Sequence, residues 1–250
     1  MVMSGISTYE TYGQCVVMRT PSEPDFWMGN CILWLRPPED PVADAKAFAS
    51  YFPGTRHVSI VWDVPDMSPD TVESKLRPLG YDVSTYESLT REGPIPTQPV
   101  PNGISIRQLE SDQDWAQLMA NQKRLGREEG RDPASHDPYL ERRYQAQRAR
   151  IGRGGGAWFG AFDGDILAGG MGMFCGNGLA RYQSVETRSD YRRQGICAAL
   201  LSHASHWAES ATPAARQVIV TDADSDAGRL YARVGFRPTE RLVDAILPGY

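Results

Sequence analysis

The chain has 250 residues, of which 41% are hydrophobic and 23% are charged, and its formal net charge at pH 7 is −5. This composition is typical of a folded globular protein with one large or two modest domains, and it argues against disorder. The negative net charge argues against nonspecific binding to nucleic acid phosphates. No apolar run approaches the roughly 18 residues that a membrane-spanning helix needs.

The N-terminus and the cysteines indicate the compartment. Met-Val-Met-Ser-Gly lacks the basic start and apolar core of a signal peptide, so a cytoplasmic location is expected. Cys15, Cys31, Cys175 and Cys197 are scattered without the spacing of metal ligands. We therefore expect reduced thiols, no structural metal, and no membrane or nucleic acid partner.

The first hundred residues predict an α/β unit. The β-branched run from Val58 to Asp63 is followed by an expected helix from Ser68 to Leu79, then by Gly80 and a closing strand. The connection Leu35-Arg-Pro-Pro-Glu-Asp-Pro holds prolines and no glycine. Three tryptophans of this part, Trp27, Trp34 and Trp62, are interpreted as core or interface residues.

A proline-rich and glycine-rich segment, residues 91–103, reads as a linker. It divides the chain into two predicted domains, residues 1–100 and 101–250. The second domain predicts the following elements in order: a strand at 104–107, a helix at 112–129, a helix at 138–151 that begins at Pro138, a hairpin of 158–162 and 166–174, and a strand at 179–187.

The stretch from Tyr191 to Leu201 predicts a basic glycine turn that opens an amphipathic helix. Unpaired amides of the first helical turn, the helix dipole, and the side chains of Arg192 and Arg193 would converge on one anion. Gly195 would let the backbone approach that anion closely. The turn therefore predicts a phosphate site.

A second motif follows the β-branched run 217–221. Residues 224–236 read Asp-Ser-Asp-Ala-Gly-Arg-Leu-Tyr-Ala-Arg-Val-Gly-Phe and predict a helix. Asp224 is expected to cap this helix at its start, and Gly235 is expected to end it.

Together the two motifs resemble those of the GNAT acetyltransferase superfamily. The signature R/Q-x-x-G-x-G/A is met by Arg192, Gly195 and, in place of its last small residue, Cys197. The pattern N-x-x-A-x-x-L-Y-x-x-x-G-F is met with Asp224 in place of asparagine, and with Ala227, Leu230, Tyr231, Gly235 and Phe236. The resemblance covers residues 104 to 248 and implies an α/β fold of the GNAT type with a mixed sheet.

The first half has a similar layout. Aligning Gly80 with Gly235 places Leu76 where Tyr231 stands, and the prolines at 37, 38 and 41 remove amides that an anion would need. We interpret residues 1–100 as a degenerate GNAT-like repeat, which makes the chain a tandem. An unrelated α/β domain of similar order is the alternative.

The resemblance implies acetyl-coenzyme A as the acetyl-donor cosubstrate. The expected cofactor-binding residues are Val185, Glu186, Thr187, Arg192, Arg193, Gln194, Gly195, Ile196, Cys197, Ala198 and Asp224. In the family, amides of the strand before the turn pair with the pantetheine arm and polarise the thioester carbonyl, and that strand is Val185 to Thr187 here. Tyr231 matches the family tyrosine that protonates the departing sulfur.

The general base stays open. Some family members have a glutamate at the position of Arg181, and arginine cannot accept a proton at neutral pH. Regular alternation places Glu186 on the opposite face of the strand from Arg181 and Gln183, where a surface role is at least as plausible as catalysis. Asp222 acting through water, or no dedicated base at all, are further alternatives. Cys197 is interpreted as a small packing residue rather than as a nucleophile of lowered pKa.

These features predict an N-acetyltransferase that moves an acetyl group directly to a primary amine of a small molecule or a peptide. An acyl-coenzyme A-binding pseudoenzyme or sensor is the alternative, because no base is evident. A nucleotide-binding protein is a weaker one, because the turn lacks the lysine and Ser/Thr of a Walker motif. Either a monomer or a homodimer is expected.

Overall fold

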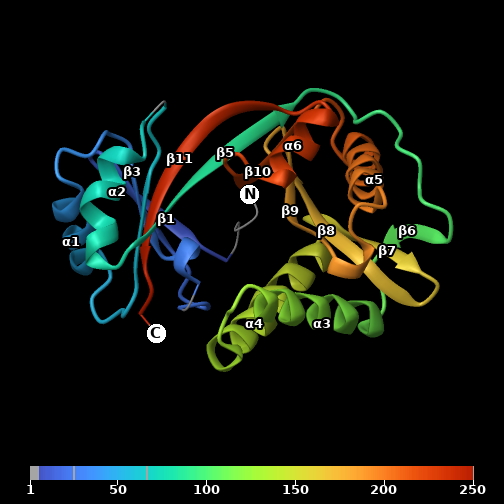
Figure 1. Ribbon diagram of the computed structural model, residues 1–250, viewed down its shortest axis with the longest axis horizontal. Coiled ribbons are helices and arrows are strands. Elements are labelled where there is room, and N and C mark those ends of the chain that lie inside the picture. The colour runs from blue at the N-terminus through green and yellow to red at the C-terminus, as the bar shows by residue number, and fades with distance from the viewer. Residues whose placement is uncertain (1–5, 25, 66, 250) are drawn as a thin grey trace. The chain divides into compact units, whose positions relative to one another are not determined.

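The computed structural model describes residues 6–24, 26–65 and 67–249. The chain forms two compact units. The larger unit consists of Thr90–Ile219 and Leu230–Phe236, and the smaller unit of most of the first 89 residues with Val220–Arg229 and the last strand. The ribbon is shown in Figure 1.

The larger unit holds the first motif and the second half of the second motif, from Leu230 to Phe236. Its elements are β6 (Ile104–Gln108), α3 (Asp112–Glu128), α4 (Pro133–Gly152), β7 (Gly156–Asp163), β8 (Ile166–Gly176), β9 (Leu179–Thr187), α5 (Ile196–Ala211), β10 (Arg216–Asp222) and α6 (Asp226–Arg233), the last two crossing the division between the units. The strand order is β10-β9-β8-β7-β6, with β9 and β10 parallel and the other pairs antiparallel.

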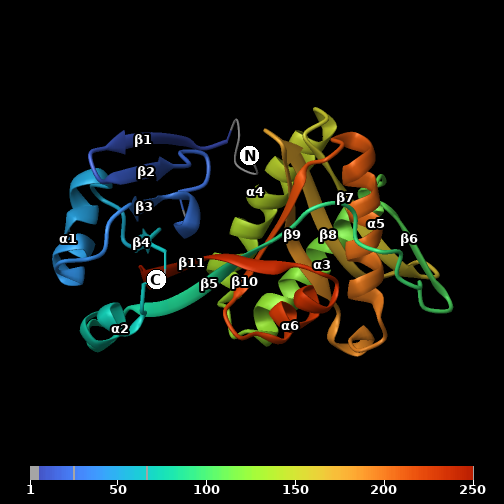
Figure 2. The same ribbon diagram turned by 90° about the horizontal axis from the view of Figure 1, so that it is seen from above.

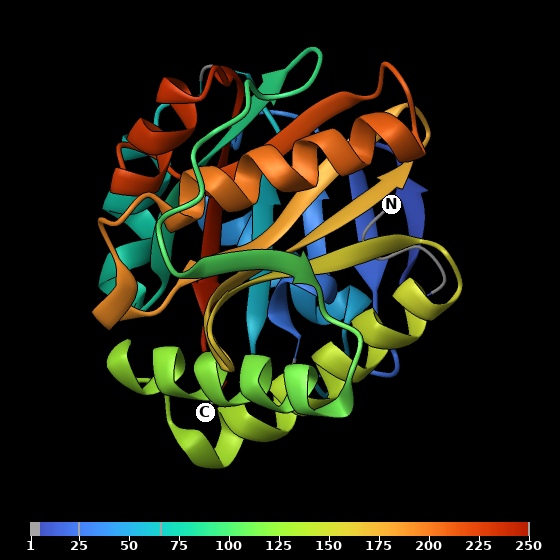
Figure 3. The same ribbon diagram turned by 90° about the vertical axis from the view of Figure 1, so that its right-hand side faces the viewer.

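Helices cover both faces of this sheet. In Figure 3, α5 crosses one side of the strands while α3 and α4 lie on the other. Alternation along β7 supplies both cores: the ring of Trp158 packs on Tyr144 of α4 and Trp115 of α3, whereas Phe159 meets His203 and Trp207 of α5. We name the two sides the α3/α4 face and the α5 face.

The smaller unit is a second α/β layer, shown in Figure 2. Its elements are β1 (Thr8–Tyr12), β2 (Cys15–Arg19), β3 (Cys31–Trp34), α1 (Pro41–Tyr51), β4 (Val58–Trp62), α2 (Asp70–Leu76), β5 (Asp82–Arg91) and β11 (Arg237–Leu247). The strand order is β1-β2-β3-β4-β11-β5. Residues from β3, β4, β11, α1 and α2 form its apolar core, in which Trp62 is fully buried and Trp34 nearly so.

Two expectations about the elements are corrected. The helix expected from Pro138 begins at Pro133, because Asp132 caps it through the amide of Ala134, and Pro138 lies inside α4. The expected linker has no helix or strand at residues 92–103, yet it is anchored: Ile95 is fully buried and its amide donates to the Ser205 hydroxyl of α5. This part of the chain therefore packs as a strap on α5.

Candidate active site

Strand β9 contains a β-bulge. Gly172 of β8 pairs with Gln183, and Gly170 of β8 pairs with Glu186. Between these two pairs, β9 therefore has one residue more than β8. Ser184 within this interval has a φ of 49°, a left-handed conformation that is uncommon outside glycine. Such an insertion interrupts the ladder and re-aims the residues that follow it, Val185 to Thr187.

Strand β9 also separates from its parallel neighbour. In the described residues, the pairing with β10 ends at Arg181 and Val218, so residues 182–187 have no strand partner on that side. Just beyond the last pair, the buried Tyr182 hydroxyl donates to Gln217 Oε1 at 2.7 Å, and the Ser205 hydroxyl donates to the same oxygen at 2.8 Å. β9 and β10 are thus held together up to Arg181 and Val218, and beyond this point, next to the bulge, they are not paired.

The turn after β9 presents a run of amides. Arg193 and Gly195 have φ values of 65° and 87°, and Gly195 is the residue that precedes helix α5. The first helical hydrogen bond runs from the amide of Ala199 to the carbonyl of Gly195. Among the residues that the structure describes, the backbone N–H groups of residues 193–198 donate no hydrogen bond. Successive free amides at a helix N-terminus form a concave anion site.

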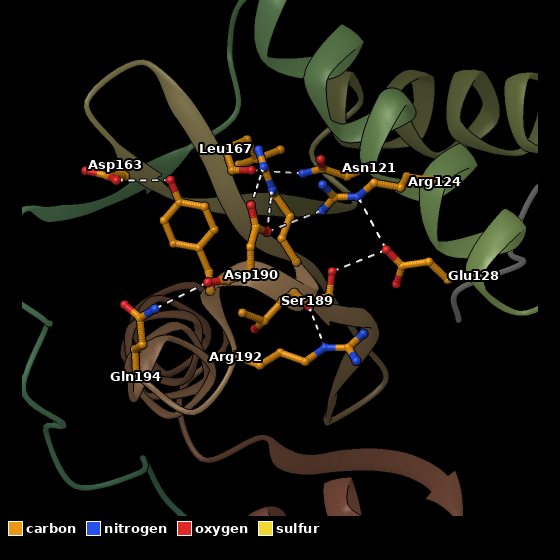
Figure 4. Close-up of polar contacts among 12 residues, drawn as sticks. Asn121, Arg124, Glu128, Asp163, Leu167, Ser189, Asp190, Arg192 and Gln194 are labelled. Carbon is orange, nitrogen blue, oxygen red and sulfur yellow. Dashed lines mark hydrogen bonds and ion pairs between the residues drawn. The ribbon is translucent and has the colours of Figure 1, made fainter.

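Ion pairs hold this turn in place (Figure 4). Asp190 accepts hydrogen bonds from Arg188 at 2.7 and 3.1 Å, and Arg124 of α3 lies 3.7 Å from the same carboxylate. The Tyr191 hydroxyl donates to Asp163 at 3.0 Å. The conformation of the turn is therefore set by the sheet and by α3 before any ligand binds.

The arginines of the turn differ in what they do. Arg192 Nε donates to the carbonyl of Thr187 at 3.1 Å, which ties the turn to the end of β9. Arg193 is exposed and has no side-chain partner among the described residues. Arg193 is thus free to meet an anion, whereas Arg192 positions the strand end.

Cys197 stands in the first turn of α5. Burial raises the pKa of its thiol to about 12, so the thiol is protonated at neutral pH. The prediction of a small packing residue is consistent with this, and activation by the helix N-terminus is not observed.

Tyr231 of α6 lies beside Cys197. Its side chain is 5% exposed and packs edge-on against Phe236. Burial and the neighbouring Cys197 thiol raise the pKa of the phenol above its usual value, so the hydroxyl keeps its proton at neutral pH. No hydrogen-bond partner for that hydroxyl is found within the described ranges. A protonated and unpaired phenol therefore stands near the start of α5.

Glu186 corrects the expectation from alternation. The bulge at Ser184 adds one residue, so Glu186 returns to the face of Gln183 and Arg181 instead of the opposite one. It accepts a hydrogen bond from Gln122 of α3, while its Oε1 is buried without a partner among the described residues. Burial raises the pKa of Glu186 to about 8, against the opposing effects of Gln122 and the Arg124 charge.

Two residues that were not singled out from the sequence complete this environment. Tyr144 of α4 interacts with the side chains of Ser184 and Glu186, and burial together with the Glu186 charge raises its pKa. Gln122 holds the carboxylate of Glu186. No sequence signal marked either residue, since a buried tyrosine and a helical glutamine are ordinary.

Asp224 is the predicted site residue whose expected local role is wrong. The cap of α6 is Ser225, whose hydroxyl accepts from the amide of Gly228 at 3.1 Å. Asp224 has a φ of 60° and its carbonyl accepts from Arg229. It belongs to the smaller unit, whereas the other predicted site residues all lie in the larger one.

The described part of the chain contains no group of three or more His, Cys, Asp or Glu side chains placed to hold a metal ion. Every helix within the described ranges is too short or too polar to cross a bilayer.

Residues 117–236 match the family model described as the Acetyltransferase (GNAT) family. Residues 117–236 therefore form a domain of the GNAT superfamily. Family membership indicates acyl transfer from an acyl-coenzyme A. The free amides at 193–198, the positive φ of Gly195 and the opened strand β9 fit such a molecule, since they offer donors for its phosphates and for its amide-containing arm.

Solved structures share this GNAT fold over nearly the whole chain. A functionally unknown conserved protein from Staphylococcus epidermidis is 12% identical, with a TM-score of 0.75 over 96% of this chain and 93% of that one. A GCN5-related N-acetyltransferase from Kribbella flavida is 16% identical, with a TM-score of 0.65 over 99% and 92%. A tandem GNAT protein from the clavulanic acid biosynthesis pathway is 13% identical, with a TM-score of 0.57 over 98% and 84%. No curated protein sequence matches the chain.

Proposed function

We propose that the protein is an N-acetyltransferase that moves an acetyl group from acetyl-coenzyme A to a primary amine by direct transfer. The observation that carries this proposal is the combination of a bulged, unpaired end of β9 with a turn of free amides before α5. Both features lie in the larger unit and are joined by only a few residues. They match the shape of an extended arm that ends in a diphosphate.

Each part of the cosubstrate would have its own residues. The amides from Arg193 to Ala198, with the Arg193 side chain, would hold the diphosphate, and Arg192 and Gln194 would support the turn. The backbone of Val185 to Thr187 would pair with the pantetheine arm. An amide near the bulge would stabilise the negative charge that develops on the thioester oxygen, an interaction typically worth a few kcal/mol.

Two side chains would move protons. Tyr231 would donate its proton to the departing thiolate, a transfer made feasible by a phenol that is protonated at neutral pH. Glu186 would accept the proton of the attacking amine, because its Oε1 is unpaired and its pKa of about 8 is close to neutrality. Glu186 would therefore be the general base, a role that the sequence analysis left open.

The smaller unit is proposed to be a degenerate repeat of the same fold. Its order β3-α1-β4-α2-β5 parallels β9-α5-β10-α6-β11. At the start of α5 the larger unit has free amides. At the corresponding start of α1, Pro41 has no amide N–H, and the amide of Val42 already donates to the side chain of the cap residue Asp40. Gly80, like Gly235, has a positive φ after its helix, and the buried Leu76 replaces the tyrosine.

The acceptor is proposed to be a small-molecule or peptide amine, handled in the cytoplasm by a monomer or a homodimer. Nothing in the charge or the helices favours a nucleic acid or membrane partner.

The proposal is tested with Tyr231→Phe, which keeps the ring and removes the acid. Steady-state release of the coenzyme thiol across an amine panel should fall about 10²-fold to 10⁴-fold, the usual contribution of a general acid. Coenzyme A affinity should not change, and Tyr81→Phe in the smaller unit serves as a matched control. Tight coenzyme binding without turnover of any amine by the unmodified protein would instead identify an acyl-coenzyme A sensor.

A further inference from the structure

Arg181 is a partly buried cation without a counterion among the described residues. It lies on β9, opposite Phe174 of β8 and beside Val218 of β10, two apolar residues. Its guanidinium makes no ion pair or hydrogen bond with any residue that the structure describes. Burial lowers its pKa, and no neighbouring acid counteracts this.

Two other arginines of the chain have a carboxylate partner that is itself buried. Arg36 binds Asp44 at 2.6 Å and Arg107 binds Asp114 at 2.8 Å, each through two hydrogen bonds. A desolvated charge is costly unless it is compensated, and Arg181 lacks the carboxylate partner that Arg36 and Arg107 have. A guanidinium is also the side chain best shaped to bind a carboxylate or a phosphate with two hydrogen bonds.

The position of Arg181 relates it to the proposed chemistry. Its partner Phe174 and the partner of Glu186, Gly170, are four residues apart on β8, so Arg181 and Glu186 lie on the same α3/α4 face. At about 3.3 Å per residue, the two backbone positions are about 13 Å apart. A cation without a counterion and a carboxylate with one unpaired oxygen thus share one strand face, with only Gln183 between them in that row.

We propose that the acceptor amine carries an anionic group, a carboxylate or a phosphate, which Arg181 binds while the amine lies next to Glu186. This inference rests on the proposed function and adds a substrate class to it. The separation along β9 favours acceptors in which several atoms lie between the amine and the anion. Arg181 would thus act in specificity at a position where other family members have a glutamate.

The test compares matched amines. Initial rates with acetyl-coenzyme A are measured for 4-aminobutyrate, 3-aminopropyl phosphate and butylamine, using the full chain and the variants Arg181→Gln, Arg181→Lys and Arg237→Gln. Arg237 is an exposed arginine of β11 and is the control for loss of one positive charge. The two anionic probes separate a carboxylate acceptor from a phosphate acceptor.

For at least one anionic amine, kcat/KM should exceed that of butylamine by tenfold or more. Arg181→Gln should abolish this preference through KM, Arg181→Lys should keep part of it, and Arg237→Gln should keep all of it. Equal use of charged and neutral amines by the unmodified protein would overturn the inference and leave the proposed function standing, as would turnover of butylamine without turnover of either anionic amine. Absence of coenzyme A binding would overturn both. Thermal melting of each variant shows whether it is folded. If Arg181→Gln is unfolded, Arg181→Lys is compared with the unmodified protein instead.

Discussion

At the level of single residues, Glu186 has the properties of a proton acceptor tuned by its surroundings. It is held by Gln122 through one carboxylate oxygen, and the other oxygen is buried and unpaired. Burial raises its pKa from 4.5 to about 8, so the carboxylate that accepts a proton accumulates only as the pH rises toward and past 8. Its protonation state therefore changes in the physiological range.

This property predicts the pH dependence of catalysis. The value of kcat/KM should rise as the pH increases from 6 to 9, with a midpoint near the pKa of about 8. Glu186→Gln should lose the rise and lower the rate about 10²-fold or more. Rates for Glu240→Gln, an exposed acid of β11, provide the control. A profile that keeps its midpoint in Glu186→Gln would show that another group accepts the proton.

Gln122 gives a second prediction at this scale. Its hydrogen bond lowers the pKa of Glu186 against the effect of burial, so Gln122→Leu should move the midpoint of the rate profile to higher pH. Gln122→Glu should move it further, because a second carboxylate disfavours ionisation. Identical midpoints in all three proteins would contradict a positioning role for Gln122.

At the level of elements, the turn before α5 depends on the backbone of Gly195. A Cβ added there would meet only Pro101, at 3.9 Å, so the φ of 87° rather than lack of space requires glycine. Gly195→Ala should cost about 1–2 kcal/mol of stability and should weaken coenzyme A binding, because the amides of the turn would be displaced.

Gly154→Ala is the matched control for this strain. Gly154 has a φ of 80° and no heavy atom within 4 Å of an added Cβ, and it lies outside the turn. Denaturant unfolding should show a similar loss of stability in both variants, whereas calorimetry should show weaker coenzyme A binding in Gly195→Ala alone. An unchanged affinity of Gly195→Ala for coenzyme A would show that the turn is not part of the binding site.

The sequence allowed most elements of the larger unit to be predicted, because periodicity, caps and glycines are local signals. The strand at 179–187 and the hairpin before it were predicted from the sequence pattern. The turn before α5 and Tyr231 were singled out because they match the GNAT motifs. The bulge at Ser184 could not be predicted, since no residue type marks it and only pairing with β8 reveals it. Glu186 was therefore assigned to the wrong face, and its contact with Gln122 was missed.

At the level of the whole chain, the last strand belongs to the smaller unit. β11 pairs with β4, which brings Val243 opposite Trp62. Such a contact between distant segments has no local signal, so its partner could not be predicted from the sequence. It places Asp244 in the middle of the sheet, 1% exposed and with one carboxylate oxygen unpaired among the described residues.

Asp244 makes the stability of the protein depend on pH. Burial raises its pKa to about 7, so between pH 4 and pH 7 the folded protein holds a proton that the unfolded chain releases. Stability from this group is therefore lost as the pH rises through that range. Asp244→Asn should be about 2–4 kcal/mol more stable than the unmodified protein at pH 8, with a difference that shrinks toward pH 4. Urea unfolding at pH 5 and pH 8 measures this, with Asp63→Asn at an exposed site as the control. A difference that does not vary with pH would contradict the assignment.

The binding of an acyl-coenzyme A at the turn before α5 is measured most directly by titrating coenzyme A into the full chain in a calorimeter. One molecule should bind per chain, with affinity reduced in Gly195→Ala and retained in Gly154→Ala. Folded protein that takes up no coenzyme A, even with the ligand in large excess, would contradict both the site and the acetyltransferase function proposed from it.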